Sequence, residues 1–76
     1  MSGFCFALGQ LREDRAVTRT GWNGKQMWIK LQRPDENSKM TLPYIYMCTT
    51  TGDLVPWLAS QTDILGTDWE VVLNPV

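Results

Sequence analysis

Aromatic and polar side chains in a short turn are the first residues of this chain that could do chemistry. The stretch TGWNGKQMW, residues 20–28, places Trp22 and Asn23 in a turn bounded by two glycines. The face of an indole can stack on a nucleobase, which is worth about 1–3 kcal/mol per base. An Asn amide can read the edge of a base with its donor and its acceptor. This turn therefore predicts a binding surface for a flat, base-like ligand.

The residues of this turn also have structural interpretations. Trp22 could instead cover the core from the turn, and the sequence leaves both interpretations open. Turn chemistry is the favoured interpretation of Asn23, because Asn tolerates left-handed backbone geometry. Arg19 and Lys25 could each meet a phosphate, although a surface charge is the default interpretation of both residues.

A second stretch, VPWLASQTD at residues 55–63, combines an aromatic side chain with a polar helix start. Backbone N–H groups of residues 60–63 could bind a phosphate or ribose oxygen. Its alternative interpretation is a Trp packed under a loop, with a serine as the helix N-cap. Trp28 and Trp69 lie in predicted strands, so we assign them to packing or to a subunit interface. From this second stretch, the candidate ligand-binding residues are Trp57, Ser60, Gln61, Thr62 and Asp63.

Catalytic and metal chemistry find little support. The chain has no histidine, which excludes Ser–His and Cys–His nucleophile pairs and leaves too few ligands for zinc. Asp63, Asp68 and Glu70 could supply paired carboxylates to a metal or to acid catalysis, but solvated charges or helix caps are favoured. Cys5 and Cys48 form no CxxC pair, and two buried free thiols are expected rather than a disulfide. We expect a protein that is not an enzyme and has no cofactor.

Length and charge limit the class of protein. The 76 residues suffice for a single domain, 1–76. So short a chain buries only about 60% of its unfolded surface, so oligomerisation is expected to add stability. A net charge of −1 argues against duplex nucleic acid as a partner. Residues 1–11 have no signal-peptide pattern, and no segment approaches the roughly 20 apolar residues of a membrane span. We expect a soluble, intracellular protein.

Hydrophobic spacing predicts the elements that must position these residues. Phe4, Ala7, Leu8 and Leu11 form one face of a helix of about ten residues, with Ser2 as its N-cap. A shorter helix is expected within 59–65, capped by Ser60 and stopped at Gly66. Period-2 alternation and β-branched residues predict strands at 16–20, 27–32, 44–49, 54–55 and 69–73, with a polar loop at 33–41.

This order of elements indicates an α+β fold. We expect an N-terminal helix packed on a small, largely antiparallel sheet of four to five strands, with a short second helix. Trp28, Lys30 and Gln32 should share one face of their strand, and Met27, Ile29 and Leu31 the other face, with one of the two sides buried. Pro56 should end its strand or place it at a sheet edge.

Three motifs together resemble the phage Thoeris anti-defence 2 family over about residues 3–73. They are the FxxALxxL pattern of the first helix, RTGWNGKQMW, and DLVPWLASQTDILGTDWEVV. Cys5 departs from the small or acidic residue expected in this helix, away from the candidate pocket. The resemblance implies small α+β homotetramers that act as sponges. They would hold glycocyclic ADP-ribose, the signal of bacterial TIR-domain enzymes, without cleaving it, so that the Thoeris effector is not activated.

The resemblance also implies a location and a site. The protein would work in the cytoplasm of the infected or lysogenic bacterial host, and some relatives also hold cyclic oligonucleotides at a separate site. Family pockets form between chains, and Trp22, Asn23 and Trp57 match them here. Trp22 and Trp57 are hypothesised to clamp a base from two faces. The alternatives are a structural protein whose Trp residues form an interface, and a hydrolase using Asp63 or Asp68.

Overall fold

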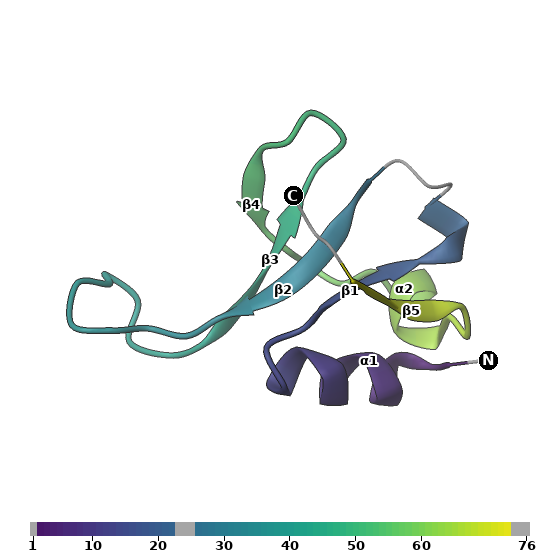
Figure 1. Ribbon diagram of the computed structural model, residues 1–76, viewed down its shortest axis with the longest axis horizontal. Helices are drawn as coiled ribbons and strands as arrows, with labels where there is room; N and C mark the ends of the chain where they lie inside the picture. Colours follow the sequence, from purple (N-terminus) through teal and green to yellow (C-terminus); the bar gives the residue numbers. More distant parts are fainter. Residues whose placement is uncertain (1, 23–25, 74–76) are drawn as a thin grey trace.

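A computed structural model describes residues 2–22 and 26–73 of the chain. Figure 1 shows one helix beside a twisted sheet, with a short second helix. In chain order the elements are α1 (Phe4–Arg12), β1 (Ala16–Arg19), the 3₁₀ turn η1 (Thr20–Trp22), β2 (Trp28–Gln32), β3 (Tyr44–Cys48), β4 (Leu54–Pro56), α2 (Gln61–Leu65) and β5 (Trp69–Val72). The predicted α+β fold is confirmed.

The sheet has the strand order β4-β3-β2-β1-β5, and all its neighbours are antiparallel. β4 is an edge strand that contains Pro56, as the sequence predicted, because a proline cannot donate a backbone hydrogen bond. β5 forms the opposite edge. β1 and β2, which precede and follow the candidate turn, pair with each other. On its other side β1 pairs with β5.

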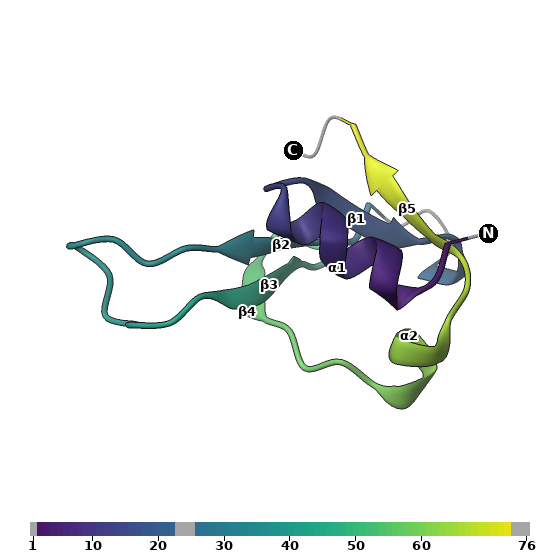
Figure 2. The same ribbon diagram turned by 90° about the horizontal axis from the view of Figure 1, so that it is seen from below.

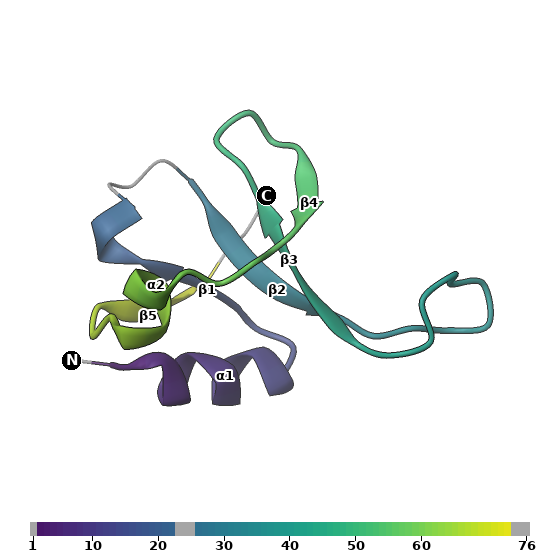
Figure 3. The ribbon, with the colours of Figure 1, turned by 180° about the vertical axis from the view of Figure 1, so that it is seen from behind.

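Residues 57–60 carry the chain from one edge of the sheet to the other. Figure 3 shows this segment crossing the strands from β4 to α2, which lies beside β5. The crossing brings the second candidate stretch to the same end of the molecule as η1. Figure 2 shows the loop between β2 and β3 extending away from the opposite end of the molecule.

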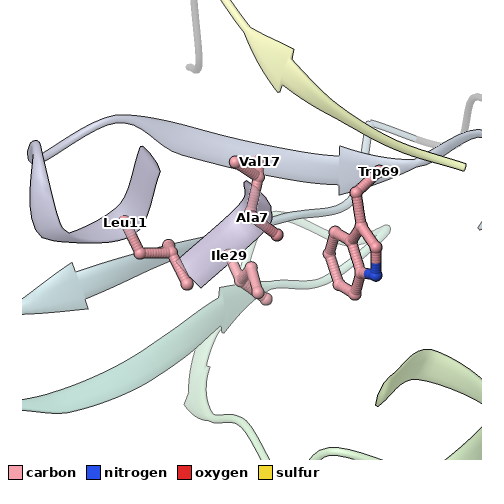
Figure 4. Close-up of a cluster of buried hydrophobic side chains, with 5 residues drawn as sticks. All are labelled: Ala7, Leu11, Val17, Ile29 and Trp69. Atoms are coloured by element: carbon pink, nitrogen blue, oxygen red, sulfur yellow. The ribbon is translucent and has the colours of Figure 1, made fainter. Parts of the chain in front are cut away.

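The core lies between α1 and the sheet. Figure 4 shows its five buried side chains directed toward one another, from α1, β1, β2 and β5. The predicted inner face of α1 is confirmed, since Ala7 and Leu11 are fully buried while Phe4 and Leu8 pack partly against the core. Ile29 of β2 is also fully buried, as its alternation predicted. The buried cluster consists of Ala7, Leu11, Val17, Ile29 and Trp69.

The N-cap of α1 and the exposure of Cys5 differ from the sequence predictions. The N-cap of α1 is Gly3, without a side-chain cap, because Ser2 is used in an extended bridge to Asp68. The helix predicted within 59–65 is confirmed as Gln61–Leu65, with Ser60 as its N-cap and Gly66 as its C-cap. Both cysteines are free, but Cys5 is exposed rather than buried, because it lies off the apolar face of α1.

No helix in the described part of the chain is long and apolar enough to span a membrane.

Candidate ligand-binding site

Trp22 ends the 3₁₀ turn that follows β1, and its indole is held on two sides. Its ring lies 5.4 Å from that of Trp69, centroid to centroid, at an interplanar angle of 79°. Such an edge-to-face arrangement is favoured by the aromatic quadrupole. The indole Nε1 donates a hydrogen bond of 3.2 Å to Asp63 Oδ1. Trp22 remains only half-buried. It therefore both packs on the core and keeps part of its surface accessible.

Arg19, the last residue of β1, binds the two carboxylates that flank this turn. Its Nη1 lies 2.9 Å from Asp63 Oδ1, and its Nε lies 2.7 Å from Asp68 Oδ1. Asp68 Oδ2 in turn accepts a hydrogen bond of 2.7 Å from the backbone N–H of Gly21. The Arg19 side chain is only 14% exposed, so its interpretation as a surface charge is wrong. We call Arg19, Gly21, Trp22, Asp63 and Asp68 the Arg19 cluster.

The electrostatics of the Arg19 cluster keep its charged groups ionised. Burial opposes ionisation of Asp63, but hydrogen bonds, led by that from Arg19, outweigh it and hold the pKa of Asp63 below its ordinary value. The hydrogen bond from Arg19 also lowers the pKa of Asp68, with help from the Gly21 N–H. Both carboxylates raise the pKa of Arg19. At neutral pH the cluster thus holds one positive and two negative charges.

Asp63 joins the Arg19 cluster to α2 and to the core. Its backbone N–H donates to Ser60 Oγ at 3.1 Å, which confirms Ser60 as the predicted N-cap. Its carbonyl oxygen accepts a hydrogen bond of 3.0 Å from Trp69 Nε1. The interpretation of Asp63 and Asp68 as solvated charges is wrong, because both carboxylates bind Arg19. No cluster of metal-ligating side chains occurs among the described residues.

Trp57 is a second aromatic residue whose ring contacts that of Trp69. Its ring lies 6.1 Å from the ring of Trp69 and 6.1 Å from that of Phe4. Its backbone N–H donates to the carbonyl of Ile45 at 3.0 Å. In the aromatic pairs of the described residues, Trp22 and Trp57 are each joined to Trp69 and not to one another. That arrangement gives no support to a clamp in which both rings of one chain face the same base.

Trp57 also borders an open apolar groove of about 900 Å³ between α1 and the end of the sheet. Arg12 and Arg33 stand among its otherwise mostly apolar walls. A bound flat ligand or an apolar surface of another protein chain could fill this groove. Its apolar lining includes Phe4, Leu8, Leu31, Leu42, Ile45 and Ile64.

The remaining predicted residues are exposed at the start of α2 or lie outside the described residues. Ser60, Gln61 and Thr62 are exposed at the start of α2, with the Ser60 hydroxyl used as the cap. Asn23 and Lys25 lie outside the described residues. Sequence reasoning missed the linking roles of Arg19, Gly21 and Asp68. No local pattern signalled them, because Arg19 and Asp68 are 49 residues apart.

Comparisons with known proteins identify the family. A model of the Thoeris anti-defense 2-like domain matches residues 2–72. The chain is also 32% identical over 79 residues to a Bacillus phage SP01 protein named Thoeris anti-defense 2, covering 87% of this chain and 89% of that protein. The match spans α1, the whole sheet and the Arg19 cluster. This chain belongs to the Thoeris anti-defense 2-like family, a group of anti-defence proteins directed against Thoeris.

Proposed function

We propose that this protein is a sponge for a TIR-derived cyclic ADP-ribose-type signal, glycocyclic ADP-ribose. It would bind the signal without cleaving it and so prevent activation of the Thoeris effector. The observation that carries the proposal is the half-buried indole of Trp22, held by the ring of Trp69 and by a hydrogen bond from its nitrogen to Asp63, in a member of an anti-defence family. An adenine base is a flat ligand of the kind that such an indole can stack on.

Preorganisation of Trp22 supports sequestration. A sponge must bind tightly, and ordering the site on binding would subtract from affinity. The contacts with Asp63 and Trp69 restrict the indole before any ligand arrives. The hydrogen bond from Gly21 to Asp68 similarly restricts the backbone of the turn. Little conformational entropy would then be lost at Trp22 when a base stacks.

The state of the carboxylates supports binding without hydrolysis. A general acid at neutral pH needs a pKa near 7, whereas the pKa values of Asp63 and Asp68 lie below the ordinary 3.8. Both carboxylates are also engaged with Arg19. A hydrolase that used either group as an acid would have to break these ion pairs first.

We further propose that the working form is a homotetramer whose pockets are completed by a neighbouring copy. Large apolar side chains are exposed around the groove and α2, with Leu42 74%, Leu58 93% and Leu65 76% exposed. Extensive apolar exposure on a small protein marks an interaction surface. A second copy seated there would bury these side chains and enclose the Trp57 groove.

The proposal is tested by depletion and release. Purified protein is incubated with glycocyclic ADP-ribose, filtered, and the free ligand is quantified by mass spectrometry before and after heat denaturation of the retained protein. Ligand that disappears and returns intact supports a sponge. New products in place of intact ligand would mean a hydrolase, which contradicts the proposal.

A parallel incubation with a cyclic dinucleotide, and with ADP-ribose as a non-cyclic control, examines the class of ligand. Light scattering during chromatography gives the oligomeric state of the same sample. An oligomer that depletes none of these nucleotides would support the alternative, in which the Trp residues build a protein interface.

A further inference from the structure

We infer that Arg19 is a positioning residue that fixes the orientation of the Trp22 indole through Asp63 and Asp68. Its consequence for affinity rests on the proposed function, in which Trp22 stacks on the ligand. Arg19 itself is bound to the protein's own carboxylates rather than presented to solvent. Its role is therefore separate from the phosphate contact that its charge suggested.

Two connections run from one guanidinium to the turn. Through Asp63, Arg19 reaches the side chain of Trp22, because Asp63 Oδ1 accepts hydrogen bonds from both residues. Through Asp68, it reaches the backbone, because Asp68 Oδ2 accepts from the N–H of Gly21. The residue before Trp22 and the indole itself are thus held by the same cation.

Only an arginine suits this position. Its planar guanidinium presents several N–H donors in a fixed fork, so it can hold two carboxylates at once in a defined geometry. A lysine has one compact ammonium and cannot reproduce the separate Nε and Nη1 contacts. Without the cation, two partly buried carboxylates would repel each other, and each would withdraw toward water from its contact with the turn.

Two glycines make room for the side chains of the Arg19 cluster. A Cβ at Gly66 would lie 2.8 Å from Arg19 Nε, and a Cβ at Gly21 would lie 3.0 Å from Asp68 Oδ2. The φ of Gly66 is −65° and its ψ is 150°, a conformation that alanine adopts without strain. Alanine at position 66 would therefore displace the guanidinium while it removes no hydrogen-bonding group. This provides a direct way to disturb Arg19.

The test compares Gly66→Ala with Gly9→Ala, a matched control at which an added Cβ meets nothing within 4 Å. Near-UV circular dichroism reports the orientation of the indoles, and the part due to Trp22 is identified with Trp22→Phe. Depletion of glycocyclic ADP-ribose reports affinity. We expect Gly66→Ala to lose the Trp22 signal and at least tenfold in affinity, with an unchanged far-UV spectrum, whereas Gly9→Ala behaves as wild type.

Arg19→Lys is the second variant, needed if Gly66→Ala fails to fold. It keeps the charge and should show the same two losses, because the fork is gone. A wild-type Trp22 signal in these variants would overturn the inference, whereas unchanged affinity beside an altered signal would overturn its consequence for affinity. If the wild-type protein depletes no ligand, the proposed function fails, while the spectra still decide whether Arg19 orients Trp22.

Discussion

Trp22 Nε1 donates a hydrogen bond to Asp63 Oδ1 across 41 residues of sequence, at 3.2 Å. This contact joins the two stretches that the sequence singled out, the glycine-bounded turn and the polar helix start. It also provides the indole N–H with a hydrogen-bond acceptor, so that a ligand would not have to provide one. The remaining interaction that Trp22 can offer is through its ring surface, which is the interaction that a base uses.

Two substitutions of Trp22 separate stacking from hydrogen bonding. Trp22→Ala removes the ring and should abolish retention of glycocyclic ADP-ribose in a protein that remains folded. Trp22→Phe keeps an aromatic face but loses the N–H to Asp63, so its affinity should be intermediate. Filtration with mass spectrometry measures both, and far-UV circular dichroism checks the fold. Retention by Trp22→Ala at the wild-type level would eliminate the stacking role.

The stability of the protein should fall in acid because of the Arg19 cluster. The pKa values of Asp63 and Asp68 are lower in the folded state than the ordinary 3.8. The unfolded chain therefore binds more protons than the folded chain as the pH falls past 3.8, so the stabilisation present above that pH is lost through and below it. Urea denaturation at a series of pH values measures this loss.

Asp68→Asn should make that pH dependence shallower, because one of the two depressed carboxylates is gone. Arg33→Gln is its control. It breaks the ion pair of Arg33 with Asp14, whose side chains are 52% and 61% exposed, and such surface pairs contribute little to stability. A wild-type slope in Asp68→Asn would show that its carboxylate does not contribute to the acid transition.

The cap of α2 should matter more than its exposed side chains. Ser60→Ala removes the acceptor of the Asp63 N–H and should lower the free energy of unfolding by about 1 kcal/mol. Thr62→Ala, at an exposed position of the same helix, should change it by less than about 0.5 kcal/mol. Equal effects in urea denaturation would mean that the cap is not formed in solution.

The core should tolerate truncation poorly. Ile29→Ala, at a fully buried position, should cost about 2–5 kcal/mol of unfolding free energy through lost burial and the cavity left behind. Leu58→Ala removes a side chain that is 93% exposed and should leave the stability of the isolated chain nearly unchanged. Should Leu58→Ala instead unfold the protein at low concentration, its side chain would be contributing to an assembly.

The sequence alone determined the elements and their inward faces. Hydrophobic periodicity is a local property, so the α1 face with Ala7 and Leu11 and the buried side of β2 at Ile29 could be predicted. Local turn and cap chemistry likewise predicted Ser60 as an N-cap and Pro56 at a sheet edge. These predictions needed only neighbouring residues, and the structure confirms them.

Only the tertiary structure decided which polar groups meet. The pairing of β1 with β5 brings Arg19 opposite Trp69, beside Asp68, and the crossing segment after β4 brings Asp63 to the same end of the sheet. From its sequence neighbours alone, each of these charged residues is predicted to be an ordinary surface residue. Their function as one cluster depends on strand order, and strand order is a property of the whole chain, because contacts over more than 40 residues are fixed by packing rather than by local spacing.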